Sequence, residues 1–379
     1  MSSAFHVQPI PGKGLGCTAS RDVACGERLL VEAPLTIEGP GRRPLKETVA
    51  ALSTAEHQRF WALAQDETLH GLEKTVAGIA ETNGIPFYNH HKLYGGIFPV
   101  TSRFNHACDS NAVFKWNGSL GKLTVHACQP IAAGTEITLC YGFGSSSFSR
   151  RELRRAHLRL SFGFECSCAQ CELTGEALQQ SEARAATLGD HEHFFTGLWN
   201  LANAPVTVER PSVHLQKLEA LYRIMQEAGC DGGGSVHYGV DFALLGFVEF
   251  LDLCSSRVGS LAVHSRHAAH AELQTLRAHA IAYRDAARQW AREARDVTRV
   301  VAGEDSPAFE VWSAALDPAR GCWPVEPAKG SALPPMEDPG FWSGLLQPSM
   351  ATFGPPFARR WVDAGLLSTP LAKMAGWDV

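Results

Sequence analysis

Three cysteines lie within six residues of the chain, at Cys166, Cys168 and Cys171, and this spacing is typical of a metal site. Thiolates are preferred ligands of Zn²⁺, which structural sites hold by four ligands in a tetrahedron. Packing alone does not readily explain three buried free thiols in so short a segment. The chain has eleven cysteines, an odd number, and its first residues lack the pattern of an export signal, so we expect no disulfide framework. The segment predicts a metal ion that needs one further ligand.

Three other segments combine residue types that suit ligand binding. The run Gly12-Lys13-Gly14-Leu15-Gly16 allows the backbone to come close to a ligand, although such a run alone would be an ordinary tight turn. Asn105 and His106 form a polar pair that, taken alone, could simply be buried in a core. Tyr141 follows the strand-like run 136–139.

Taken in order, these segments resemble the SET-domain lysine methyltransferases, most closely the branch that includes the SMYD proteins and their fungal relatives. In that family a Gly-x-Gly segment opens the domain, an Asn-His-Ser-Cys-x-Pro-Asn motif and a Glu-Ile/Leu-x-x-x-Tyr motif follow, and Cys-x-Cys-x-x-Cys closes it as a post-SET zinc site. The resemblance covers residues 8–171, interrupted by an insert at 39–80, and rests on Gly12–Gly16, Arg103–Asn111, Gly134–Tyr141 and Phe162–Cys171.

The resemblance supplies the missing metal ligand. Cys108, inside the Asn-His-Ala-Cys run, matches the cysteine of the SET core that joins the post-SET trio. It implies a structural zinc ion, without an open coordination position, that ties the post-SET segment to the cofactor pocket. The implied ligands are Cys108, Cys166, Cys168 and Cys171.

The resemblance also implies the cofactor S-adenosylmethionine. The backbone of the glycine segment would approach it, the Asn-His pair would contact it, and Phe164 matches the aromatic residue that covers the adenine. Asn83 resembles a family asparagine that faces the cofactor, and for this residue a purely structural role stays equally open. The implied cofactor residues are Lys13, Gly14, Leu15, Asn83, Asn105, His106, Tyr141 and Phe164.

Tyr141 matches the family tyrosine whose hydroxyl lies beside the transferring methyl group and orients the acceptor amine. A lysine ammonium cannot attack a methyl group, and at pH 7 only about one lysine in a thousand or fewer is neutral. A narrow apolar channel favours the neutral amine, and inline geometry then does most of the work. The resemblance therefore implies methyl transfer to a lysine of a protein, histone or otherwise, with Tyr141 as the catalytic residue.

Several positions depart from the family pattern and keep two other hypotheses open. Ala107 and Ser110 replace the usual serine and proline, and Phe162 stands where some relatives have a second pocket tyrosine. The acceptor could instead be a small molecule, or the reaction could be changed. A hypothesis of another class is a SET fold that has lost catalysis and acts as a helical adaptor. The insert contains no cysteine, so we expect no SMYD-type MYND zinc module.

The elements that position these residues alternate along the chain, which predicts an α+β protein. Strand-like runs fill 5–38 and 83–144, with a hairpin turn at Asn117-Gly118, and helical spacing marks 53–65 and 147–160. The expected segments are an N-terminal part of the SET domain at 1–38, a helical insert at 39–82, the rest of the SET domain at 83–146, a connecting helix and post-SET zinc segment at 147–175, a helical domain at 176–320, and a Pro/Gly/aromatic-rich extension at 321–379.

The second half of the chain is predicted to be mostly helical. Apolar residues from Leu273 to Val301 recur at alternating steps of three and four, as on the buried face of a long helix. The resemblance implies that these helices form a tetratricopeptide-like array beside the substrate cleft. The stretch 290–307, with Gly-Glu-Asp-Ser at 303–306, is similar to what fungal SET proteins carry there.

Composition limits the partners. The 379 residues carry 34 Lys+Arg against 39 Asp+Glu, a formal net charge of −5 that does not favour nucleic acid. Arginines 150, 151, 154, 155 and 159 lie close together, and we expect a solvated or ion-paired helix face there rather than a nucleic-acid patch. No run of 18 apolar residues occurs, so we expect no membrane span. We expect an intracellular, cytoplasmic or nuclear monomer.

Overall fold

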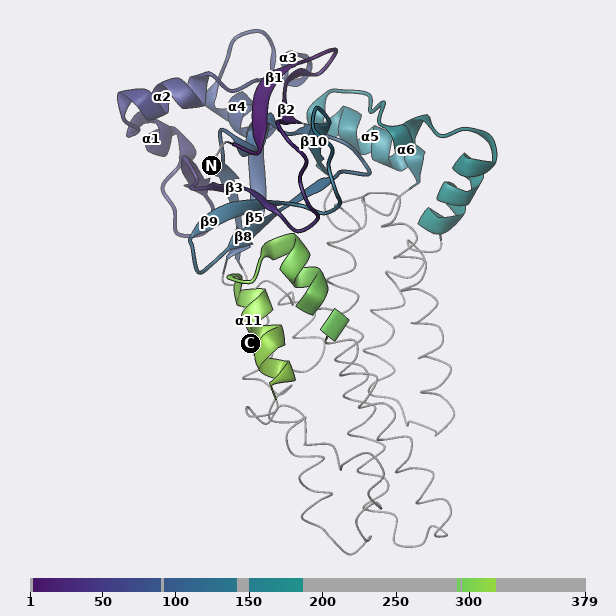
Figure 1. Cartoon of the computed structure of the whole chain (residues 1–379). Helices are drawn as coiled ribbons and strands as arrows, with labels where there is room; N and C mark the ends of the chain where they lie inside the picture. Colours follow the sequence, from purple (N-terminus) through teal and green to yellow (C-terminus); the bar gives the residue numbers. More distant parts are fainter. Residues whose placement is uncertain (1–2, 90–91, 142–149, 187–291, 294, 318–379) are drawn as a thin grey trace, which may run out of the picture. The chain divides into compact units, whose positions relative to one another are not determined.

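The computed structural model describes residues 3–89, 92–141, 150–186, 292–293 and 295–317 of the chain. In Figure 1, the strands form one group, with helices α1 and α2 on one side and α5 and α6 on the other. Residues 1–190 and Thr298–Pro307 belong to one compact unit. The predicted helical domain at 176–320 and the extension at 321–379 lie mostly outside the described residues.

The first sheet joins the two ends of the predicted SET region. A hairpin of two strands, in which Ile10 pairs with Gly14, is extended by a strand from about 120 residues downstream and then by a short parallel strand. In spatial order the strands are β1 (Phe5–Ile10), β2 (Gly14–Ala19), β10 (Glu136–Leu139) and β7 (Asn105–His106).

Two further sheets, each with three antiparallel strands, complete the β region. Side chains from all three sheets, among them Phe87, Val125 and Ile137, share one buried apolar core. The strands are β3 (Arg28–Glu32), β9 (Lys122–Ala127) and β8 (Ala112–Asn117) in one sheet, and β4 (Thr36–Glu38), β6 (Lys92–Ile97) and β5 (Gly84–Asn89) in the other.

The insert between β4 and β5 is helical, as the sequence indicates, and has a small core of its own. Val49, Phe60, Leu63 and Ile79 pack there with Ile97 of β6. Ser53 and Glu56 form a capping box that begins the second helix. The helices are α1 (Leu45–Ala50), α2 (Thr54–Trp61), α3 (Glu67–His70) and α4 (Val76–Asn83). The helix predicted over 53–65 ends earlier than expected, at Trp61.

Buried Glu32 fixes the chain just before the Asn-His pair. Its carboxylate accepts hydrogen bonds of 2.8 Å from the N–H groups of Val100 and Thr101 and one of 2.7 Å from the Thr101 hydroxyl. These N–H groups start the short helix η1 (Thr101–Arg103), whose first donors have no partner within the helix. Glu32 thereby sets the direction in which the chain enters β7.

After the SET region, α5 (Arg151–Phe162) leads to the cysteine segment, which contains the short helix α6 (Ala169–Glu172). Gly163 ends α5 with a φ of +71°, and a Cβ at this position would lie 2.0 Å from a carboxylate oxygen of Asp66. Both the left-handed conformation and this close approach require glycine. Residues 175–186 are helical, and α11 (Pro307–Leu316) follows near the end of the described chain.

The Gly-Glu-Asp-Ser stretch at 303–306 is bound to the β3–β9–β8 sheet. The guanidinium of Arg28 donates to both carboxylate oxygens of Asp305, and its Nε donates to Nε2 of His126 at 3.1 Å. Asn117 Nδ2 donates to Asp305 Oδ1 at 3.3 Å. His126 is only 1% exposed, and burial, followed by the charge of Arg28, lowers its pKa to about 4, with Asp305 opposing the shift.

We expect this histidine to make the fold acid-sensitive. In the unfolded chain His126 takes up its proton near pH 6.5, and in the folded chain only near pH 4. The contribution of neutral His126 to the free energy of unfolding is therefore fully present above pH 6.5 and is lost as the pH falls to about 4. The loss attributable to His126 is about 3 kcal/mol at most. In His126→Gln, whose amide oxygen can still accept from Arg28, urea unfolding at pH 7.5, 6, 5 and 4 should show a correspondingly flatter dependence.

His6→Gln is the matched control, because His6 lies exposed on β1. It should retain the wild-type dependence of unfolding free energy on pH. Equal pH dependence in wild type and His126→Gln would contradict the assignment.

Candidate functional site

Parallel pairing of β7 with β10 brings the Asn-His pair next to the strand that leads to Tyr141. Asn105 pairs with Thr138 and His106 with Leu139, and the N–H of Ala107 donates to the Leu139 carbonyl at 3.1 Å. Two of the predicted motifs, about 30 residues apart in the chain, therefore lie side by side.

Asn111, at the end of the Asn-His segment, locks the two motifs together. Its Nδ2 donates to the backbone carbonyl of Glu136 at 2.9 Å, and its Oδ1 accepts from the N–H of Thr138 at 2.8 Å. A side-chain amide has both a donor and an acceptor, so it can pair with a strand as a backbone peptide group does. Asn111 thereby extends the contact between the two motifs.

Glu136 connects Asn105 with the glycine segment. One carboxylate oxygen accepts from Asn105 Nδ2 at 2.9 Å, and the other pairs with Lys13 Nζ at 2.8 Å. Gly16 lies against this group, since a Cβ there would be 2.6 Å from Asn105 Nδ2. Glu136 lies within the Gly134–Tyr141 motif, and no role is predicted for it from the sequence, although a carboxylate at the start of an otherwise buried strand is a signal for one.

His106 contacts both Tyr141 and a predicted metal ligand. Its Nδ1 accepts a 3.0 Å hydrogen bond from the N–H of Tyr141, and its Nε2 lies 3.3 Å from Cys108 Sγ. Burial lowers the pKa of His106 to about 4, so the ring is neutral at pH 7. Because Nδ1 is the acceptor, the single ring proton lies on Nε2 and points toward the sulfur.

Tyr141 is surrounded by aromatic rings from two other segments. Its hydroxyl donates to the Phe104 carbonyl at 2.7 Å, and its ring centroid lies 5.0 Å from that of Phe162 and 6.4 Å from that of Phe164. Burial raises the pKa of Tyr141, so the hydroxyl stays protonated and can serve as a hydrogen-bond donor. Phe164 also lies near His106, with ring centroids 5.9 Å apart.

Asn83 and the glycine segment offer different groups to a ligand. Asn83 is buried at the end of α4, and its Nδ2 donates to the carbonyls of Ala64 and Ile79, which leaves only Oδ1 for a ligand. In β2, Gly14 has a φ of +72° and Leu15 is 44% exposed, so this strand end offers backbone and an apolar side chain to a ligand.

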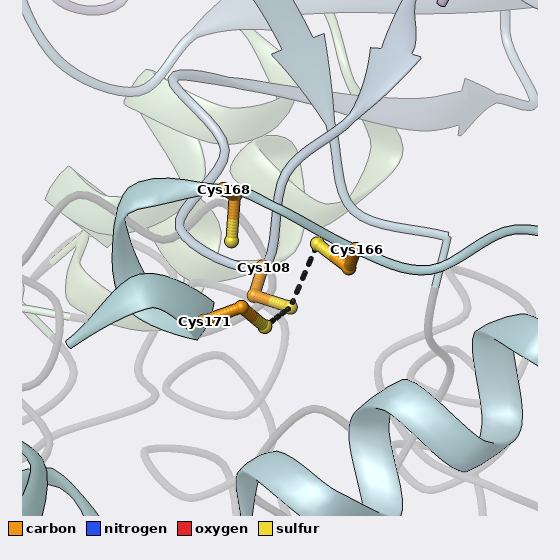
Figure 2. Close-up of side chains that lie close together, drawn as sticks. All are labelled: Cys108, Cys166, Cys168 and Cys171. Atoms are coloured by element: carbon orange, nitrogen blue, oxygen red, sulfur yellow. Dashed lines mark hydrogen bonds between the residues drawn. The ribbon is translucent and has the colours of Figure 1, made fainter. Parts of the chain in front are cut away.

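The four predicted metal ligands form one cluster, shown in Figure 2. All four sulfur atoms lie within 4.8 Å of one another, with Cys108 Sγ 3.9 Å from that of Cys166 and 3.5 Å from that of Cys171. A tetrahedral zinc with bonds of about 2.3 Å requires sulfur separations of about 3.8 Å. The donor set and its spacing therefore fit a zinc ion.

The charged groups around the cluster are Asp109 and arginines of α5. Burial, and next the charge of Cys168, raise the pKa of Asp109 to about 6. Arg151 and Arg155 donate to the Cys171 carbonyl at 3.4 Å and 3.1 Å. Buried Arg154 places Nη2 3.9 Å from Cys171 Sγ.

These contacts refine the sequence interpretation of the arginine-rich helix. Exposed Arg159 is ion-paired, with Glu165, as expected. Arg151, Arg154 and Arg155 instead face the cysteine segment, which spacing and composition alone do not predict. In the described part of the chain, no helix is long and apolar enough to cross a membrane.

Comparisons with known proteins agree with the arrangement. A family model described as "SET domain" matches residues 14–142. The chain is 31% identical over 176 residues to "Histone-lysine N-methyltransferase set5" of Schizosaccharomyces pombe, covering 45% of this chain and 50% of that protein. It is 38% identical over 77 residues to "Histone-lysine N-methyltransferase SMYD3" of Mus musculus, covering 20% and 17%, and 30% identical over 150 residues to "Protein-lysine N-methyltransferase SMYD4" of Homo sapiens, covering 37% and 18%. The chain thus spans half or less of the length of these relatives.

Proposed function

The chain belongs to the SET-domain family, and from this premise we propose that it transfers a methyl group from S-adenosylmethionine to a lysine of a protein. The observation that carries the proposal is the parallel pairing of β7 with β10, because it brings Asn105, His106 and Tyr141 together. Relatives named as histone-lysine and protein-lysine methyltransferases support a protein acceptor. Histones are the first acceptors to test, and a histone acceptor would place the reaction in the nucleus.

The residues at this site suit the parts of the cofactor. When bound, S-adenosylmethionine supplies an electrophilic methyl group on a positively charged sulfur. Aromatic faces favour a nearby cation, and the rings of Tyr141, Phe162 and Phe164 lie close together. Asn105 Nδ2 donates to Glu136, which leaves the side-chain oxygen Oδ1 of Asn105 as an acceptor for an ammonium group. The proposed cofactor residues are Lys13, Gly14, Leu15, Asn83, Asn105, His106, Tyr141 and Phe164.

Tyr141 is the proposed catalytic residue. The position of Tyr141 is fixed by two hydrogen bonds: its backbone N–H donates to Nδ1 of His106, and its hydroxyl donates to the carbonyl of Phe104. A hydroxyl held in this way can orient an incoming amine, and the neighbouring phenylalanines favour the neutral form of that amine by excluding water. Most of the rate enhancement would then come from holding the two reactants in line.

We further propose that the four cysteines hold a structural zinc ion. The ion would connect the SET core, through Cys108, to the segment that carries Phe164. Because His106 lies between Cys108 and Tyr141, the same ligand set would stabilise the catalytic tyrosine.

Replacing Asn105 by alanine should weaken binding of S-adenosylmethionine by at least about 30-fold, since an acceptor for the cofactor's charged end is lost and Glu136 loses a donor. Titration calorimetry of the purified full chain measures this directly. A radiolabelled methyl donor, offered with core histones and with small amines, then identifies the acceptor class.

Gln8→Ala removes an amide from exposed β1 and should leave cofactor affinity unchanged. Absence of binding in the wild type, in protein that holds one zinc, would contradict methyl transfer and favour the adaptor hypothesis. Methylation of small amines alone would overturn the protein-acceptor proposal.

A further inference from the structure

Arg154 differs from the other arginines of α5 in where its charge lies. Its side chain is 6% exposed and it approaches Cys171 Sγ, whereas Arg159 on the same helix is 61% exposed and pairs with Glu165. A buried guanidinium is costly unless it has a charge or hydrogen-bond partner, so its position next to sulfur atoms requires an explanation.

The charge of a four-cysteine metal site provides that explanation. Four thiolates around one Zn²⁺ leave two net negative charges, and Cys108, Cys166 and Cys171 are buried. Asp109, next to Cys108, adds a further acidic group. Within the described residues that contact the cluster, Arg154 is the cation whose side chain reaches a ligand sulfur. Arg151 and Arg155 contact the Cys171 carbonyl instead.

We propose that Arg154 is the charge partner of the metal site, a positioning residue that neutralises part of the thiolate charge and thereby sets the zinc affinity. The proposal rests on the zinc site proposed above. It assigns to α5 a role in metal binding, in addition to its packing against the cysteine segment through Leu158. Partners of metal ligands commonly change affinity by about 10- to 100-fold.

The test compares the zinc affinity of Arg154→Gln, Arg154→Lys and Arg159→Gln with that of the full wild-type chain, by competition with a chromophoric chelator at fixed pH and ionic strength. Arg159→Gln is the matched control, since it removes the same charge from an exposed position of the same helix. We expect Arg154→Gln to bind zinc 10- to 100-fold more weakly, Arg154→Lys less than tenfold more weakly, and Arg159→Gln within twofold of wild type. Absorption of the Co²⁺-substituted protein provides a second readout of the thiolate ligands.

Equal affinity of Arg154→Gln and Arg159→Gln, with one zinc bound in both, would overturn the role of Arg154 and leave the metal site intact. A wild-type chain that binds neither zinc nor cobalt would overturn both. If Arg154→Gln does not fold, Arg154→Lys decides: near-wild-type affinity supports a charge role, and complete loss of the metal contradicts it.

Discussion

We expect Cys171→Ser to lose most of the zinc proposed for the cysteine cluster and a large part of the stability of the chain. A structural zinc site contributes about 10–16 kcal/mol of binding free energy, so one of four ligands corresponds to about 3–4 kcal/mol, or several-hundred-fold in affinity. Cys171 is completely buried. Its sulfur lies 3.5 Å from that of Cys108, and its backbone carbonyl accepts from Arg155 of α5, so solvent cannot easily replace the sulfur. Metal analysis after dialysis against a weak chelator, and thermal unfolding of the same samples, measure both effects.

The loss should extend to catalysis, because His106 joins Cys108 to the backbone of Tyr141. We expect methyl transfer to fall together with zinc content across a chelator titration. Cys25→Ser is the control, since Cys25 is exposed and lies outside the cluster, and it should retain zinc, stability and activity. One tightly bound zinc in Cys171→Ser would contradict the assigned ligand set.

The cysteine cluster illustrates what the sequence reveals on its own. The close spacing of Cys166, Cys168 and Cys171 indicated a metal site before any fold was considered, but Cys108 came only from the family resemblance. A ligand about 60 residues away is brought near by tertiary structure, which local spacing does not record. The structure places all four sulfur atoms together.

Strands were predicted well where turns and apolar runs were clear: the turn at Asn117-Gly118 ends β8 and leads to β9, and the run 136–139 is β10. Strand β5 lies in the range 83–144 expected to hold strands, but no local pattern marks its own bounds, because Pro86 interrupts the alternation and a helix directly precedes it. The sheet order β4-β6-β5 explains how proline is tolerated, since β5 pairs with one strand only and an edge strand can lack a donor. The two-residue strand β7 is too short for any periodic signal.

The functions of Glu136 and Arg154 depend on pairings between distant elements and were not predicted. Glu136 acquires its role only when β10 lies between β2 and β7. For Arg154 a signal was present: residues 151, 154, 155 and 158 recur at helical spacing, so the arginines share a face with buried Leu158. Burial of that face was the missing information, and composition alone favoured a solvated one.

Tyr141→Phe should slow methyl transfer by about 100- to 1000-fold while cofactor affinity changes by less than about threefold, because the substitution removes the positioned hydroxyl oxygen that would accept an N–H of the incoming amine and keeps the ring. The ring contacts with Phe162, Phe164 and His106 and the backbone bond to His106 do not involve the hydroxyl. Single-turnover transfer of a labelled methyl group, combined with calorimetry, separates the chemical step from binding.

Tyr94→Phe is the matched control, since Tyr94 stacks on Phe87 in the β4-β6-β5 sheet and is not one of the proposed site residues. Its rate should equal that of wild type. A Tyr141→Phe rate within threefold of wild type would remove the hydroxyl from the mechanism and leave catalysis to alignment of the reactants alone. Loss of cofactor binding in Tyr141→Phe would instead show that cofactor binding requires the hydroxyl as well as the ring, since the aromatic contacts are unchanged and only the bond to the Phe104 carbonyl is gone.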